Sequence, residues 1–184
     1  MNNDPDIAPA AAPGYRAGTW KVDLAHSEIS FSVRQLVTRM RGRMTNFDIA
    51  IVTGADPSDS SVSATIDLAS VETGNARRDE HIRSSVFLDV ASHPQVTYES
   101  TGVRRAGEGW IIDGALSLHG VTRPVPLAIG AVGFVRDLDG GGRASFSATA
   151  LVDRSEFGID RWAGGGVVGT KVPISLEITA VLVP

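Results

Sequence analysis

From Thr19 onward, most of the chain alternates between apolar and polar residues with a period of two. Because successive side chains of a β-strand point to opposite faces, this alternation predicts strands with one dry face and one wet face. The segments with this pattern are 29–34, 47–51, 62–68, 96–99, 110–118, 125–129, 146–152 and 172–182. Turn-forming residues such as Gly107-Glu108-Gly109 separate them, and strands joined by short turns are antiparallel neighbours. The pattern predicts an up-and-down antiparallel sheet of about eight strands.

One charge-dense segment, from Asn75 to Ser85, interrupts the alternation. Asn75 suits a helix N-cap, because its side-chain oxygen can accept a hydrogen bond from an early helical N–H. Asp79 precedes Arg83 by four residues, which is the favourable order for an ion pair within a helix. The sequence therefore predicts one short helix near Asn75–Ser85. A single helix in an all-β chain has few places to pack, and one of them is the open end of a barrel.

Two all-β architectures agree with this series of strands: a closed barrel and a two-sheet sandwich. Closure removes exposed edge strands, and a barrel of about eight strands holds one small ligand when its inward side chains leave room. In a sandwich, small residues would instead let the two sheets approach and leave no cavity. The expected inward positions include several small residues, namely Ala64, Gly114, Ala144, Ala148 and Ala150. A cavity lined in this way accepts an apolar guest.

The composition of the 184-residue chain fits one domain and narrows the classes of partner. A formal charge of −4 with dispersed basic residues argues against binding to nucleic acid. No uncharged stretch approaches the roughly 20 apolar residues of a membrane-spanning helix. The chain has no cysteine, which excludes disulfides and thiolate metal sites.

Residues 1–18 are rich in proline and alanine and predict a flexible N-terminal tail, with a strap packed on the domain as the alternative. Residues 19–184 are then expected to form a single domain. The beginning of the chain lacks the basic start and the apolar stretch of a secretory signal, which predicts a cytoplasmic protein.

The histidines suggest two chemical sites, and the spacing supports neither. His26, His81 and His119 are a candidate metal set, but each lies in a different element and no carboxylate stands at a ligand interval. Ser27, His26 and Asp23 are a candidate hydrolytic triad, but neighbouring residues of a strand point in opposite directions. A Gly-x-Ser-x-Gly turn is also absent. The sequence therefore predicts no catalytic residue, no metal and no cofactor.

Several motifs, taken in order, resemble a known family from about Gly18 to Val183. They are Trp20-Lys21-Val22-Asp23-Leu24-Ala25-His26-Ser27, Arg41-Gly42-Arg43, the block from Ser70 to Pro94, Tyr98-Glu99-Ser100-Thr101, the segment from Gly114 to Val125 that contains Leu118-His119-Gly120-Val121, and Asp153-Arg154-Ser155-Glu156-Phe157-Gly158-Ile159. With these motifs the chain resembles the YceI-like polyisoprenoid-binding family. The resemblance implies a lipocalin-like barrel with a helix at one end, an elongated tunnel that holds a long lipid, no catalytic activity and a homodimer.

The chain departs from this family at two positions. Gln35 stands where many members have a histidine after Val-Arg, and Val86 stands where many have an acid. No role in binding a head group is therefore carried over to these two residues. Many relatives are exported, whereas the expectation for this chain is cytoplasmic.

The combined interpretation is a non-enzymatic protein that carries or sequesters a long-chain apolar lipid, such as a polyprenyl chain, a quinone or a fatty-acid derivative. The alternative is a β-sandwich module that binds another protein and no lipid. The expected lining of the tunnel is Phe31, Val33, Ile49, Ile66, Phe87, Ile112, Leu116 and Phe146. The helix offers Arg78, His81 and Arg83 to a polar head group, because arginine donors fit phosphate or carboxylate. These charges also fit a solvated helix face with internal ion pairs.

Overall fold

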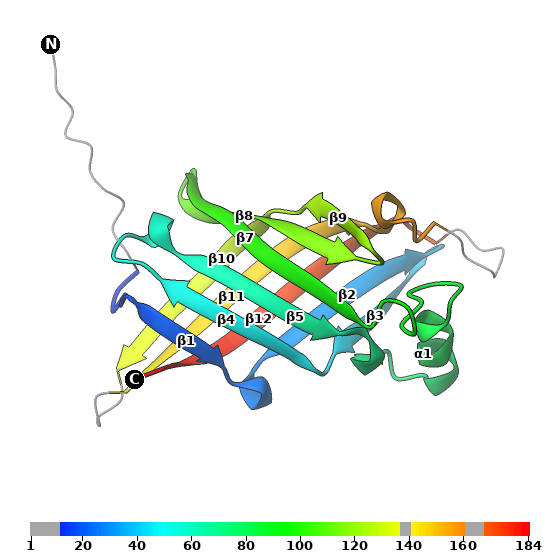
Figure 1. Ribbon diagram of the computed structural model, residues 1–184, viewed down its shortest axis with the longest axis horizontal. Coiled ribbons are helices and arrows are strands. Elements are labelled where there is room, and N and C mark those ends of the chain that lie inside the picture. Colours follow the sequence, from blue (N-terminus) through cyan, green and yellow to red (C-terminus); the bar gives the residue numbers. More distant parts are fainter. Residues whose placement is uncertain (1–11, 137–140, 161–167) are drawn as a thin grey trace, which may run out of the picture.

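The computed structural model describes residues 12–136, 141–160 and 168–184, in which antiparallel strands form one elongated barrel (Figure 1). Eight strands form the closed ring. In ring order they are β1 (Gly18–Val22), β4 (Phe47–Thr53), β5 (Ser61–Asp67), β7 (Gln95–Ala106), β8 (Gly109–Leu118), β10 (Leu127–Arg136), β11 (Gly142–Asp153) and β12 (Lys171–Leu182). Pairing of β12 with β1, which sets Trp20 opposite Leu182, closes the ring. The predicted antiparallel barrel is confirmed, and the sandwich is wrong.

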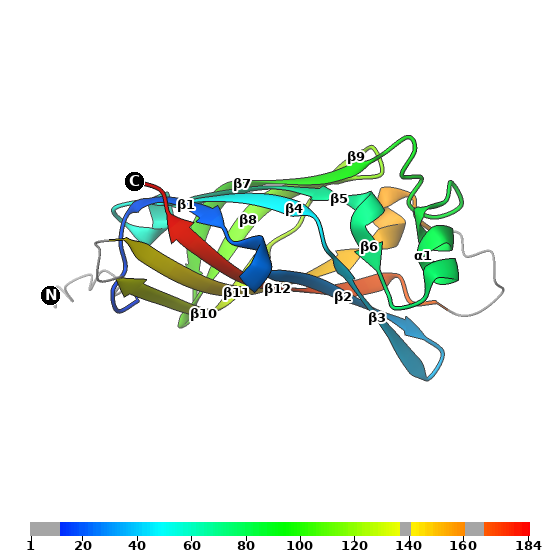
Figure 2. The ribbon, with the colours of Figure 1, turned by 90° about the horizontal axis from the view of Figure 1, so that it is seen from below.

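Further strands lengthen the barrel at one end. Along one edge, β12 pairs with β1 near its C-terminus and with β2 (Glu28–Gln35) nearer its N-terminus. β2 forms a hairpin with β3 (Thr38–Met44), which also pairs with β6 (Val71–Glu72). This hairpin projects from the barrel on the side of the helix (Figure 2). The short β9 (Val121–Pro124) pairs with β8.

The predicted helix is confirmed as α1 (Ala76–Arg83), which packs at one end of the barrel (Figure 1). Asn75 caps it, because its side-chain oxygen accepts a hydrogen bond from the backbone N–H of Arg78 at 3.0 Å. The expected ion pair between Asp79 and Arg83 is not formed. Asp79 instead accepts hydrogen bonds from the backbone N–H and the hydroxyl of Thr73. Among the described residues, no helix is long and apolar enough to cross a membrane.

Four single turns of 3-10 helix complete the described elements: η1 (Leu24–His26), η2 (Pro57–Asp59), η3 (Leu68–Ser70) and η4 (Arg154–Phe157). Each begins after an aspartate whose carboxylate accepts a hydrogen bond from a backbone N–H of the turn. This capping satisfies backbone donors that a short helix leaves unpaired. The turns therefore mark corners at which strands of the barrel end.

Trp20 of β1 is 1% exposed and lies in a core cluster with Phe47, Ile51 and Ala180. Its indole N–H donates a hydrogen bond to the Thr53 hydroxyl at 2.8 Å, and that hydroxyl donates to the Arg16 carbonyl at 2.6 Å. Tyr15 packs its ring edge against Phe134, with ring centres 5.3 Å apart. Tyr15 belongs to the segment expected as a flexible tail, but it lies on the barrel. The expectation for residues 1–11 falls outside the described residues.

Candidate functional site

The barrel contains a largely apolar cavity of about 890 Å³. Its wall includes Ile49 and Ile51, which belong to the core cluster around Trp20. The wall also includes Leu68 and Ile82, which belong to the cluster beneath α1. The cavity thus runs along the barrel between the two clusters, and its volume lies within the roughly 300–1,000 Å³ typical of ligand pockets.

Pairing between strands explains why the apolar faces meet inside. Residues opposite each other in an antiparallel pair project to the same face of the sheet. Ile174 of β12 stands opposite Phe31 of β2, and Leu116 of β8 stands opposite Tyr98 of β7. The structure places all eight residues expected to line a tunnel on the cavity wall: Phe31, Val33, Ile49, Ile66, Phe87, Ile112, Leu116 and Phe146. Their contact with a lipid stays a prediction.

The small inward residues have two different roles. Ala64, Ala148 and Ala150 lie on the cavity wall, as expected. Gly114 also faces inward, as expected, but it leaves no free space there, because Tyr98 fills the room beside it. A Cβ atom on Gly114 would lie 2.3 Å from the Tyr98 hydroxyl oxygen. Ala144 is buried in the cluster around Trp20 rather than on the cavity wall.

Tyr98 contributes a polar group to this wall without contributing a charge. Its hydroxyl donates to the Val125 carbonyl at 3.1 Å and lies 3.3 Å from the Ile112 carbonyl. Burial raises the pKa of the Tyr98 hydroxyl to about 12, and the nearby charge of Asp113 adds to the shift. Tyr98 is therefore a neutral phenol at physiological pH, and it places no charge on the cavity wall.

Two of the three residues expected to meet a head group, Arg78 and His81, lie on the cavity wall at α1. The Arg78 guanidinium is held by Thr73, whose hydroxyl and carbonyl oxygens accept its hydrogen bonds at 2.7 and 2.8 Å. Arg83 does not lie on this wall. Its guanidinium donates to the carbonyls of Ala69 and Val71 at 2.9 and 2.8 Å, which fastens α1 to β6.

The sequence interpretation missed polar residues at the other end of the cavity, near the turn between β7 and β8. Arg105 and Glu108 lie on the wall there, next to Trp110. The Arg105 guanidinium carbon is 5.6 Å from the centre of the Trp110 ring, within the range of a cation–π contact. The strand pattern predicted an apolar face for Trp110 but gave no reason to place an arginine beside it.

The sequence interpretation also did not place Arg154 at the cavity, although Arg154 belongs to one of the motifs that carry the family resemblance, Asp153 to Ile159. Arg154 is 5% exposed and lies on the cavity wall. Its guanidinium donates to the carbonyls of Gly169, at 3.1 Å, and Val168, at 3.2 Å, and also to the Ile159 carbonyl. Burial lowers the pKa of Arg154, and the charges of Asp153 and Asp160 oppose that shift. The signal in the sequence that could have identified Arg154 was its position in a charged motif between two predicted strands.

Comparison with known proteins now identifies the family. The YceI-like domain matches residues 20–180. A UPF0312 protein of Serratia proteamaculans is 37% identical over 165 residues, which cover 88% of this chain and 86% of that relative. The chain belongs to the YceI-like family. A UPF0312 protein of Pseudomonas aeruginosa is 35% identical over 165 residues, with the same coverage of 88% and 86%.

Solved structures share the fold of this YceI-like chain. The crystal structure of Burkholderia cenocepacia BcnA has a TM-score of 0.73 at 23% identity and covers 86% of this chain and 98% of its own. A polyisoprenoid binding domain from Saccharophagus degradans has a TM-score of 0.63 at 17% identity, covering 91% and 100%. At these identities the similarity shows the fold alone.

The YceI-like barrel does not assemble the two chemical sites considered from the sequence. His26 pairs with Asp23, their side-chain atoms 2.9 Å apart, while the Ser27 hydroxyl donates to the Thr179 carbonyl at 3.1 Å. His26 lies in η1, His81 lies on the cavity wall, and His119 lies in the turn between β8 and β9. Among the described residues, no group of neighbouring potential ligands contains both His119 and either of the other two. Neither the candidate triad nor the candidate three-histidine set is therefore formed.

Proposed function

We propose that this protein binds a long-chain apolar lipid in the barrel cavity and carries or sequesters it without catalysing a reaction. The observation that supports this function most is the apolar cavity of about 890 Å³, whose wall draws on nearly every strand of the barrel. The structural neighbour from Saccharophagus degradans is described as polyisoprenoid binding, which favours an isoprenoid or a similar chain as the ligand.

The hydrocarbon tail supplies most of the affinity in this proposal. Burying each methylene contributes about 0.8 kcal/mol, whereas a typical hydrogen bond contributes about 1 kcal/mol net. A long tail therefore outweighs any single contact to the head group. Arg78 and His81 at α1 are the residues proposed to orient that head group, and Arg105 is available at the opposite end.

Solvent extraction and mass spectrometry of protein purified from cells tests the proposal. We expect a long-chain lipid in the extract of the wild-type protein. In the variants Ile66→Trp and Leu116→Trp the larger side chain fills the cavity, so we expect the lipid to be absent while the melting temperature is retained. Leu151→Trp is the matched control, because Leu151 is 59% exposed on β11. Wild-type protein without lipid, or full loading of both cavity variants, would contradict the proposal.

A further inference from the structure

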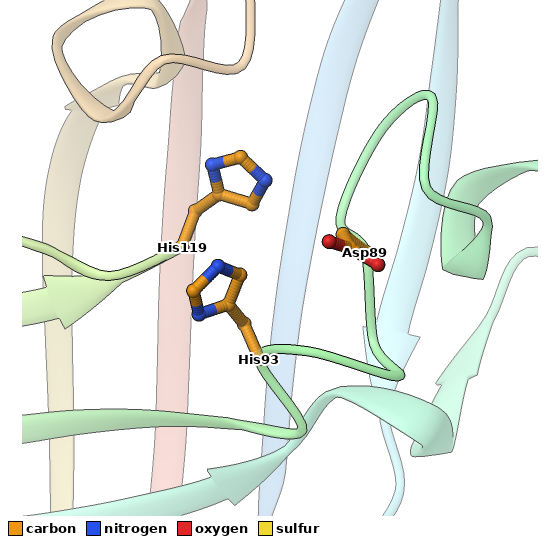
Figure 3. A group of neighbouring side chains, drawn as sticks. All are labelled: Asp89, His93 and His119. Carbon is orange, nitrogen blue, oxygen red and sulfur yellow. The ribbon is translucent and has the colours of Figure 1, made fainter.

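Three potential metal ligands meet outside the cavity wall, at the end of the barrel near α1. They are Asp89, His93 and His119, and one ligand atom from each lies within 4.8 Å of the other two. Figure 3 shows the two imidazole rings and the carboxylate facing one another. All three side chains are partly buried. Among the described residues, they are the group of three potential ligands whose ligand atoms lie this close together. The proposed lipid function uses none of them.

A tight turn brings Asp89 and His93 close together. The Asp89 carbonyl accepts hydrogen bonds from the backbone N–H of Ser92, at 3.0 Å, and of His93, at 2.8 Å. These two hydrogen bonds close a single turn in which Asp89 itself has a positive φ of +45°, and the turn keeps the two residues close together. The two ligands therefore come from one short loop that α1 and β7 hold at both ends.

His119 reaches them from a different part of the chain. It is the first residue of the two-residue turn His119-Gly120 between β8 and β9, and both residues have positive φ, +53° and +74°. This is the geometry of a type I′ turn, which histidine tolerates better than most residues. Gly120 leaves room for His93, because a Cβ atom on Gly120 would lie 2.9 Å from Cε1 of the His93 ring. The two imidazole rings are 4.8 Å apart, centre to centre.

A hydrogen bond fixes which nitrogen of His119 is available. Its Nδ1 lies 3.2 Å from the Phe157 carbonyl oxygen, which only accepts hydrogen bonds, so Nδ1 carries the proton. The lone pair of His119 is then on Nε2. Histidines that bind metal ions characteristically donate their other N–H to a backbone carbonyl or carboxylate in this way. The hydrogen bond thus prepares His119 as a ligand.

We propose that Asp89, His93 and His119 bind a divalent transition-metal ion of the zinc class. Two imidazoles and one carboxylate form a ligand set that zinc accepts, with remaining positions filled by water. In a zinc site each ligand atom lies about 2.0–2.2 Å from the metal ion. The ligand atoms of these three residues lie within 4.8 Å of one another, so binding of the ion draws the side chains closer together. A bound ion would join the loop after α1 to the β8–β9 turn, and through Phe157 to η4.

Titration of metal-free full-length protein with Zn²⁺, followed by calorimetry, tests this site. We expect one equivalent to bind, and Zn²⁺ to raise the melting temperature, because a ligand that binds the folded state stabilises it. Asp89→Asn and His93→Phe each remove one ligand and preserve the size of the side chain. We expect both to weaken binding by at least about tenfold. His26→Ala is the matched control, since His26 is an exposed histidine that pairs with Asp23 and lies outside this group.

The absence of saturable binding by the wild-type protein would overturn the proposal. Equal affinity of the wild-type protein and both ligand variants would also overturn it, because the ion would then bind elsewhere. Circular dichroism establishes that the variants are folded, and two independent variants guard against a folding defect in one of them. Ile66→Trp should still bind Zn²⁺, so failure of the lipid proposal and failure of the metal proposal are distinguishable.

Discussion

Tyr98 illustrates how one residue controls both the packing and the charge of the cavity wall. Its hydroxyl donates a hydrogen bond to the buried Val125 carbonyl and lies 3.3 Å from the buried Ile112 carbonyl. Tyr98→Phe leaves these acceptors without their partner, so we expect the free energy of unfolding to fall by about 1–3 kcal/mol in denaturant titrations at neutral pH. An unchanged free energy of unfolding would mean that this hydroxyl contributes nothing to stability.

The raised pKa of Tyr98 also predicts a dependence on alkaline pH. Because the folded-state pKa is about 12 and the ordinary value is 10.0, the folded protein holds this proton more tightly than the unfolded chain. The contribution to stability is fully present below pH 10 and is lost as the pH rises through about 12. Unfolding measured from pH 9 upward should therefore show a smaller loss of stability in Tyr98→Phe than in the wild-type protein.

At this scale the sequence predicted the direction of side chains better than their partners. The period of two placed Ile49, Ile66 and Leu116 on the inner face, where the structure has them. It gave no sign that Tyr98 lies over Gly114, because that contact depends on the register between β7 and β8. Likewise, the sequence predicted Arg83 at a head group. In the structure its guanidinium donates to the Ala69 carbonyl, just before β6, and to the Val71 carbonyl, within β6. Contacts of this kind depend on the distance between elements, which local patterns do not encode.

At the scale of elements, α1 offers a direct test of its cap. Asn75→Ala removes the side-chain acceptor for the Arg78 N–H, so we expect a loss of about 1 kcal/mol in the free energy of unfolding. Asn75→Asp is the matched control, because aspartate caps equally well and should retain nearly all of the stability. Equal losses in both variants would show that the amide of Asn75, rather than the cap, matters.

The strands and the helix followed from local patterns, whereas closure of the barrel did not. Alternation and turn residues predicted the antiparallel series, and the Asn75 cap predicted where α1 begins. Closure depends on the pairing of β1 with β12, which lie at opposite ends of the chain, and that contact has no local signature. The resemblance between the chain and its family supplied this information. The alternation of residues did not predict the extension by β2, β3 and β6. Along one edge, the long β12 pairs with β1 near its C-terminus and with β2 nearer its N-terminus, and a local pattern does not show that one strand has two partners on the same edge.

At the scale of the whole molecule, the shape of the cavity predicts how affinity depends on the length of the ligand. We expect the dissociation constants of a series of saturated fatty acids to fall about fourfold with each added methylene, which corresponds to about 0.8 kcal/mol. The decrease should end when the tail fills the cavity of about 890 Å³. Calorimetry or displacement of a fluorescent fatty acid measures this series.

The matching alcohols separate the tail from the head group in the same experiment. If the tail dominates, acids and alcohols of equal length differ by a constant factor, and both series reach their limit at the same length. Arg78→Gln should then reduce the affinity for the acids more than that for the alcohols, because an arginine interacts more strongly with a carboxylate than with a hydroxyl. Affinity that does not change with chain length would contradict burial of the tail in the barrel, because each methylene placed in an apolar cavity must contribute.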